Sequence, residues 1–237
     1  MGRTEKLDKK TWSSIRPHLK NSYDYNVTWE KVITLFKQRI DDFYFNPINS
    51  ILKPNSQKGE GFAIVTLQCA LIETFAAFKH GKIYNSKKKG KLPNYEYSGS
   101  SVFFIAFLLS EEIFKDHFFT IDANGVKKEN YPYNAKEFYE RVRCGLMHEA
   151  RTKEDWRITA NPKKTGSNRF IGKDGDDKVI HRTVLNDKLK DYFNNKYLSS
   201  LREINANGNK LRRFLGRKLD HLHSLKKDVT YDWWDDK

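Results

Sequence analysis

The chain has 237 residues, which is enough for one large domain or two small ones with a sizeable hydrophobic core. Lys and Arg total 44 against 30 Asp and Glu, and the formal net charge of +14 favours an anionic partner, with nucleic acid first. An aromatic content of 14% argues against general disorder, and two cysteines, Cys69 and Cys144, are too few for a disulfide framework, so we expect a cytoplasmic protein.

The N-terminal residues 1–28 are polar and mixed, which predicts an arm or a short helix around Trp12–Leu19. Its first ten residues contain no apolar stretch, so no signal peptide is expected. Thr28 is suitably placed to cap a helix that begins at Trp29, because apolar residues then recur at helical spacing. Pro47 and Pro54 are expected to end this helix and to mark a loop.

A second helix is predicted from about Glu60 to His80, with an apolar surface that runs almost all the way round. Such a helix belongs in the middle of a bundle. Gln68 and Glu73 interrupt the apolar run, and no transmembrane segment is predicted. A buried carboxylate needs a partner, so Glu73 is expected either to pair with a core arginine or to act in a functional site.

The segment from Gly81 to Ser98 is predicted to be a basic loop, in which lysines are interleaved with tyrosines. This composition suits a single-stranded nucleic acid, through phosphate attraction and base stacking, although an ordinary solvated loop has the same composition. The lysines concerned are Lys87, Lys88, Lys89 and Lys91.

Further helices are predicted from Ser100 or Ser101 to about Phe118 and from Asn134 to about Arg151. Residues 152–183 then alternate in polarity around the turn signal Asp174-Gly175, which predicts a small β-hairpin insertion.

Another helix should begin at Asn186 or Asp187 and end at Asn207-Gly208, and a strongly basic helix should cover about 209–226. From the basic helix, Arg212, Arg213 and Arg217 are candidates for contacts with RNA. The acidic and aromatic tail, residues 227–237, is expected to dock on a basic groove of its own chain or of a partner. The fold class is therefore mainly α: a helical domain over 29–237, built as a bundle of five or six helices.

The helix at 134–151 carries polar groups that packing does not require. Phe138, Val142 and Leu146 share one arc, while Arg143 lies roughly 140° from His148 on an ideal helix. The two could meet over one ligand if the helix were distorted near Gly145, or if a second copy of the helix lay opposite. A neutral imidazole can accept the proton of a ribose 2′-hydroxyl, and a guanidinium can stabilise the charge that develops on the phosphoryl oxygens. Together they would cleave RNA without a metal.

The segment Arg143-Cys-Gly-Leu-Met-His148, late in an all-α chain, resembles the Arg-x4-His motif of the HEPN superfamily, in an uncharacterised bacterial HEPN-like branch. The resemblance implies a metal-independent ribonuclease with Arg143 and His148 as catalytic residues, and a homodimer whose two motifs face one another across a cleft and form one composite site. It also implies a toxin, phage-defence or other antiviral setting, with an antitoxin or defence-system protein as a possible partner. The sequence departs from the family after the arginine, where Cys144 replaces the usual Asn, Asp or His, and a thiol is a weak hydrogen-bond donor.

Two hypotheses follow. The first is a metal-independent endoribonuclease built on Arg143 and His148. The second is a non-catalytic helical module that binds RNA, a nucleotide or a partner protein, in which Arg143 is simply paired with Glu73. Neither hypothesis requires a cofactor, and neither metal-ligand spacing nor a phosphate-binding fingerprint occurs in the sequence. The supporting residues expected around the first site are Glu73, Cys144, Arg141 and Arg151.

Overall fold

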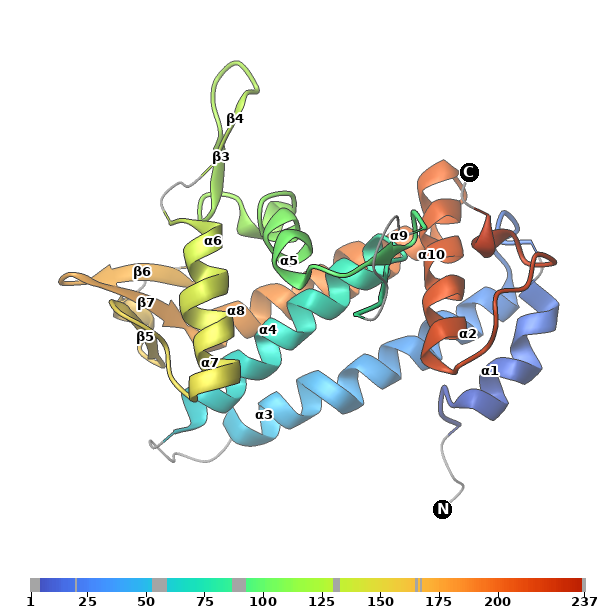
Figure 1. Ribbon diagram of the computed structural model, residues 1–237, viewed down its shortest axis with the longest axis horizontal. Helices are drawn as coiled ribbons and strands as arrows, with labels where there is room; N and C mark the ends of the chain where they lie inside the picture. The colour runs from blue at the N-terminus through green and yellow to red at the C-terminus, as the bar shows by residue number, and fades with distance from the viewer. Residues whose placement is uncertain are drawn as a thin grey trace. The chain divides into compact units, whose positions relative to one another are not determined.

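The computed structural model describes residues 5–19, 21–52, 59–86, 93–129, 133–164, 166 and 168–235. The protein is mainly helical with small sheets, which confirms the predicted α class. The chain divides into two compact units, drawn together in Figure 1. Unit 1 comprises Met1–Phe43, Thr74–Ser98 and Phe193–Lys237, and unit 2 comprises Tyr44–Glu73 and Gly99–Tyr192.

Unit 1 begins with helix α1 (Lys9–Ile15), which continues as the 3-10 helix η1 (Arg16–Leu19). Asp8 caps α1, because its side chain accepts a hydrogen bond from the Thr11 backbone N–H at 2.7 Å. The predicted helix at the N-terminus is thus confirmed. It is part of the core of unit 1 and not a separate arm, since the Trp12 side chain is fully buried.

The next helix starts earlier and runs further than predicted. Helix α2 (Val27–Ile40) begins after Asn26, whose side chain accepts hydrogen bonds from the backbone N–H groups of the first turn, so the prediction that Thr28 is the cap was wrong. Helical structure continues through the π-helical segment η2 (Asp41–Phe45) into α3 (Asn46–Leu52), so the prediction that Pro47 ends the helix was also wrong. The wide turn directly before the proline is a distortion of the kind that lets a helix tolerate the missing N–H.

Helix α4 (Glu60–Lys79) has the predicted bounds to within one residue, and its last turn belongs to unit 1. Within the part of the chain that the structure describes, α4 is the one helix long and apolar enough to cross a membrane, with 56% of its apolar window buried. The core helix of a soluble protein passes the same test, so this finding is weak evidence for a membrane span. After α4 the chain forms two short parallel strands, β1 (Ile83–Tyr84) and β2 (Glu96–Tyr97).

Asn207-Gly208 does not end a helix, contrary to the prediction. Helix α9 (Leu198–Arg202) stops before it, and α10 (Ala206–Leu222) begins after Asn205, whose side chain accepts from the Gly208 N–H at 2.8 Å. A Cβ at Gly208 would lie 2.1 Å from the carbonyl oxygen of Glu203, so the glycine permits a close approach of two backbone segments and does not mark a turn.

The C-terminal tail packs into unit 1 through the 3-10 helix η7 (Asp232–Trp234), which confirms that the tail docks on its own chain. Its anchor is the fully buried carboxylate of Asp220. The indole N–H groups of Trp12, Trp233 and Trp234 donate to this carboxylate at 2.9, 2.8 and 2.7 Å, and Arg16 donates at 2.9 Å. The acidic side chains of the tail add contacts of their own, because the Asp232 carboxylate accepts from the Ser22 N–H at 3.1 Å and the Asp228 carboxylate lies 3.7 Å from Arg16.

Unit 2 contains helix α5 (Ser100–Leu108), which ends about ten residues before the predicted position. The chain then passes through the 3-10 helix η3 (Glu112–Phe114) into an antiparallel hairpin of β3 (Phe119–Ile121) and β4 (Lys127–Glu129), which projects from the helices of this unit (Figure 1). Asp122 forms the turn, since its side chain accepts from the backbone N–H groups of Asn124 and Val126.

The predicted hairpin after residue 152 is part of a three-stranded sheet. Strands β6 (Ile171–Asp174) and β7 (Asp177–His181) pair antiparallel around the predicted turn, and Gly175 has the positive φ of +63° that this turn requires. Strand β5 (Trp156–Thr159) pairs with β7 as well, but in parallel, so that the strand order is β5-β7-β6.

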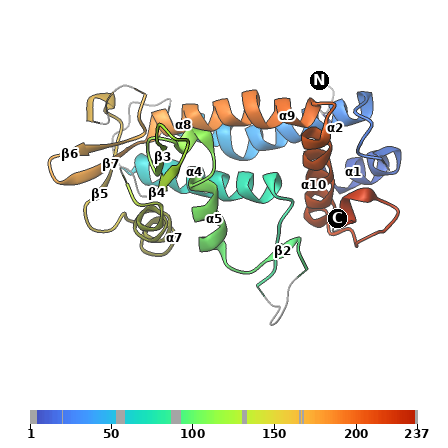
Figure 2. The same cartoon turned by 90° about the horizontal axis from the view of Figure 1, so that it is seen from above.

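Helix α8 (Arg182–Asp191) begins four residues before the predicted start, because His181 is its cap. The imidazole Nδ1 accepts from the Val184 N–H at 3.0 Å, while Nε2 lies 2.8 Å from the carbonyl oxygen of Ala160. The start of α8 lies against α4, where the Gln68 amide donates to the Arg182 carbonyl at 2.7 Å (Figure 2). Helical structure continues from α8 through the π-helical segment η6 (Tyr192–Tyr197).

Candidate functional site

The helix that carries Arg143 and His148 consists of three continuous segments in unit 2. These are α6 (Ala135–Glu137), the π-helical η4 (Phe138–Arg143) and α7 (Cys144–Glu149). Asn134 caps the start, as its side chain accepts from the backbone N–H groups of residues 136 and 137. The predicted apolar arc of Phe138, Val142 and Leu146 is buried, and Phe138 packs on Trp156 of the sheet with ring centroids 5.5 Å apart.

Arg143 is held by Glu73 of helix α4. A guanidinium nitrogen lies 3.0 Å from the carboxylate, and the two side chains are only 18% and 22% exposed. The guanidinium also lies over the ring of Tyr139, one turn earlier, at 5.4 Å. Burial lowers the pKa of Arg143, but the hydrogen bond and the charge of Glu73 raise it by more, and the guanidinium remains charged. Of the two roles expected for Glu73, the structure shows the pairing with an arginine.

Tyr139 and Ser100 complete this cluster, and neither was among the residues expected from the sequence. Their hydroxyl groups are 2.9 Å apart, and burial raises the pKa of Tyr139, so the phenol keeps its proton at neutral pH. The position of Tyr139 four residues before Arg143 was the available signal, because side chains with that spacing lie on one face of a helix.

His148 lies in a different environment from Arg143. Its side chain is exposed, and none of the residues that the structure describes forms a hydrogen bond or an ion pair with it. The helical distortion ends at Arg143, and α7 is regular from Cys144 onward, so the angle of about 140° between the two positions is kept. Within one copy of the chain, the structure does not bring the guanidinium and the imidazole together.

Gly145 lies close to another backbone segment. A Cβ at this position would be 2.5 Å from the carbonyl oxygen of Arg151. Helix α7 ends at Ala150, which has a left-handed φ of +52°, and the chain then folds back along the helix, where the Lys153 N–H donates to the Arg141 carbonyl at 2.9 Å. Gly145 therefore fixes the path of the chain after α7.

The supporting residues are dispersed around the helix. The Arg141 guanidinium forms an ion pair with Glu154 at 2.7 Å, and the Arg151 side chain is 70% exposed and reaches Glu149 at 3.4 Å. Cys144 is a half-buried free thiol next to the Arg143 cluster. Cys69 is also free, but burial raises its pKa to about 12, which leaves it unreactive at neutral pH.

The residues expected to contact RNA fall into three groups. Lys87, Lys88, Lys89 and Lys91 lie outside the described residues. Arg212 is fully buried and donates to the backbone carbonyls of Ser22, Leu201 and Glu203, so it is a structural residue and not an RNA contact. Arg213 and Arg217 line a hollow on unit 1.

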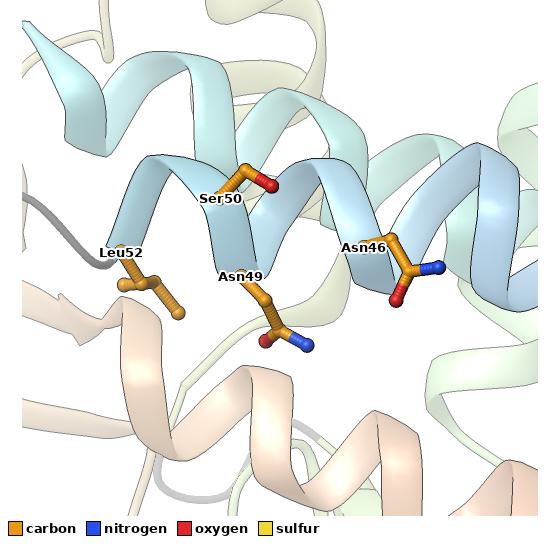
Figure 3. A pocket seen from close by; sticks show the side chains of 4 residues that line it. All are labelled: Asn46, Asn49, Ser50 and Leu52. Atoms are coloured by element: carbon orange, nitrogen blue, oxygen red, sulfur yellow. The ribbon is translucent and has the colours of Figure 1, made fainter.

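Among the described residues, no group of three or more His, Cys, Asp or Glu side chains is arranged to hold a metal ion. A hollow along α3 in unit 2 is lined by Asn46, Asn49, Ser50 and Leu52, with the two amides on the same side of the helix (Figure 3). This lining contains no charged or titratable side chain, so it offers no acid or base for catalysis.

In comparisons with known proteins, no protein-family model matches the chain, no curated protein shows significant similarity to it, and no solved structure matches it significantly. The resemblance to the HEPN superfamily thus rests on the residues of the Arg143–His148 segment and on the helical class of the fold.

Proposed function

We propose that the protein is a metal-independent endoribonuclease whose site combines Arg143 of one copy with His148 of a second copy. The proposal rests on the charge and the position of the Arg143 side chain and on the exposure of the His148 side chain. Arg143 is charged, fixed by Glu73 and still 18% exposed, and His148 is exposed on the next turn of the same helix. A fixed guanidinium needs no reorganisation to stabilise a developing phosphoryl charge, which is the condition for effective electrostatic catalysis.

In this mechanism the neutral imidazole of His148 accepts the proton of the ribose 2′-hydroxyl. The 2′-oxygen then attacks the adjacent phosphorus, the bond to the 5′-oxygen breaks, and the leaving oxygen is protonated. The products are a 2′,3′-cyclic phosphate and a 5′-hydroxyl. Arg143 stabilises the phosphoryl oxygens during the attack, and the net charge of +14 attracts the polyanionic substrate.

A second copy is part of the proposal because one copy keeps the two groups on different sides of the helix. In a symmetric dimer, each surface meets its own equivalent, so Arg143 of each copy can face His148 of the other. Such a dimer would contain two identical sites.

The test is a cleavage assay on a structured RNA in EDTA, with analysis of the new ends. We expect 2′,3′-cyclic phosphate ends, a loss of at least about a hundredfold in rate for His148→Ala, and no loss for His18→Ala, which removes another exposed histidine, in unit 1. Full activity of purified His148→Ala would contradict the proposal.

Mixing the two inactive variants tests the shared site. Arg143→Ala and His148→Ala are each inactive, but a mixed dimer regains one intact site, so random mixing should restore about a quarter of the wild-type activity. A site contained in one copy would give no restoration.

The second candidate is a helical module that binds RNA or a partner without cleaving it. The Arg143–Glu73 ion pair favours it, because a structural pair explains the position of the guanidinium without any catalytic role. RNA binding by the wild type without new ends, unchanged by His148→Ala, would establish this candidate. Glu73→Gln distinguishes the two candidates further. If Glu73 positions a catalytic arginine, the substitution lowers the cleavage rate. If the pair is structural, the substitution lowers only the stability of the protein.

A further inference from the structure

Unit 1 contains a hollow of about 520 Å³ that the proposed cleavage does not use. Most of its lining comes from two elements: the end of helix α4, with His80 and Lys82, and helix α10, with Lys210, Arg213 and Arg217. Tyr23, Asn94 and Asp235 complete the lining. This volume is within the range of small-molecule sites, which is roughly 300–1,000 Å³.

The end of α4 has the backbone geometry of a Schellman cap, which fixes the first wall. The Gly81 N–H donates to the Phe78 carbonyl, the Lys82 N–H donates to the Ala77 carbonyl at 2.9 Å, and Gly81 has a φ of +57°. A Cβ at Gly81 would lie 2.6 Å from the ring of Phe214, so only glycine lets the cap pack against α10. The cap and this packing hold His80 and Lys82 beside the basic helix.

The second wall is one face of α10. Lys210, Arg213, Phe214 and Arg217 are spaced by three and four residues, so their side chains lie on the same side of the helix. Two cations lie near the Phe214 ring, with Lys210 at 5.7 Å and Arg217 at 5.6 Å from its centroid. At the rim, Tyr23 is 61% exposed. The hollow thus combines positive charge with aromatic surface.

The charge of this surface is not balanced by carboxylates from the hollow itself. Its lining carries four permanently positive side chains and one acidic residue, Asp235. The hydrogen bonds of Arg213 end on the backbone carbonyls of Asp232 and Asp235, and Lys82 donates to the carbonyl of Asn94. The carbonyl acceptors orient the Arg213 guanidinium and leave its charge in place. A concave surface with one sign of charge concentrates ligands of the opposite sign.

We propose that this hollow binds a nucleotide, with its phosphate on Lys210, Arg213 and Lys82 and its base against Phe214 and Tyr23. The nucleotide is either a free nucleoside phosphate or the terminal residue of an RNA strand. Phosphate is the anion that several convergent Lys and Arg donors recognise best, and a base stacks on aromatic rings whatever its identity. The site lies in unit 1, so it does not depend on cleavage by Arg143 and His148 of unit 2.

Titration of the full chain with four probes tests the proposal: AMP, adenosine, inorganic phosphate and a 5′-phosphorylated RNA tetranucleotide. Binding is measured by calorimetry at low salt. We expect saturable binding of AMP or of the tetranucleotide, and at least about tenfold weaker binding of adenosine. Binding of AMP identifies a free nucleotide as sufficient, and binding of the tetranucleotide alone identifies an RNA end.

Lys210→Gln is the decisive variant, because Lys210 is exposed and its removal leaves the core intact. It should weaken binding about tenfold, and Lys210→Glu should weaken it further, since one charge-assisted contact is lost in the first and repulsion is added in the second. Lys196→Gln removes an exposed lysine of the same unit outside the hollow and should change binding by less than about twofold. Equal affinity of wild type and Lys210→Gln, equal affinity for AMP and adenosine, or no saturable binding of any phosphate probe would overturn the proposal.

Discussion

The buried carboxylate of Asp220 gives the sharpest prediction about stability, for the substitution Asp220→Asn. In the wild type this carboxylate is fully buried and accepts hydrogen bonds from three indoles and from Arg16. Three of the donors share the oxygen Oδ2, while Trp12 bonds Oδ1, and the Nε of Arg16 also lies 2.8 Å from Oδ1. An asparagine amide has one oxygen, so the best arrangement keeps the three donors on that oxygen and turns the NH2 group towards Trp12.

The magnitude follows from this geometry. Each of the three remaining hydrogen bonds loses its charge assistance, at about 1 kcal/mol apiece, and one buried indole N–H loses its acceptor, at about 1–3 kcal/mol. The total of about 4–6 kcal/mol overlaps the 3–5 kcal/mol that is typical for breaking a buried ion pair. With a urea m-value of roughly 2 kcal/mol/M, a loss of about 4 kcal/mol lowers the unfolding midpoint by about 2 M.

The assay is urea unfolding followed by tryptophan fluorescence, because Trp12, Trp233 and Trp234 surround the altered group and report on unit 1. Asp24→Asn is the matched control, since Asp24 is exposed in the same unit and its loss should cost less than about 0.5 kcal/mol. A midpoint for Asp220→Asn that coincides with that of the control would refute the reasoning.

Three further predictions concern glycine packing and the dependence of stability on pH. Gly145→Ala should destabilise unit 2 by about 1–3 kcal/mol, because its Cβ would meet a backbone oxygen at 2.5 Å, whereas Gly99→Ala, with open space around it, should change the thermal midpoint little. Burial lowers the pKa of His117 to about 4 from its ordinary 6.5. The contribution of neutral His117 to the free energy of unfolding is therefore fully present above pH 6.5. It is lost as pH falls towards 4, by up to about 3 kcal/mol. His117→Gln should make the urea midpoint less dependent on pH in this range. The hydrogen bonds from Arg202, with a smaller opposing effect of burial, lower the pKa of Glu30 to about 2. Stability from this pair is present above pH 4.5 and is lost as pH falls through 2. Glu30→Gln should therefore cost no more than about 1 kcal/mol at pH 7, since the pair is partly exposed, and clearly less at pH 2. A cost for Glu30→Gln that is the same at both pH values would contradict this assignment.

The Arg143 cluster shows how far the sequence could define the candidate site. The helix, its apolar arc and the requirement that Glu73 have a partner could all be read from local patterns, because periodicity and the cost of a buried charge act within a short stretch of chain. The pairing of Arg143 with Glu73 joins residues 70 positions apart, and only the packing of α4 against the Arg143 helix decides it. The same holds for Tyr139 and Ser100, whose contact depends on where α5 lies.

For the basic residues of α10, the sequence could not predict which side chains are buried. Their spacing predicts a basic helix, yet it does not say which side of that helix is buried. The structure buries Arg212 among backbone carbonyls and turns Arg213 towards the hollow. Neighbouring arginines in the sequence thus have different roles, because residues next to one another on a helix point about 100° apart.

By itself, the sequence determined the features that depend on neighbouring residues: the helical class, the extent of α4, the Arg143–His148 helix and the turn at Gly175. Tertiary structure alone decided the contact of His181 with the Ala160 carbonyl, the parallel pairing of β5 with β7, and the use of Asp220 as the anchor of the tail. The physical reason is the same in each case. A hydrogen-bond acceptor or a strand edge can serve several partners, and the fold of the whole chain selects which of them comes within reach.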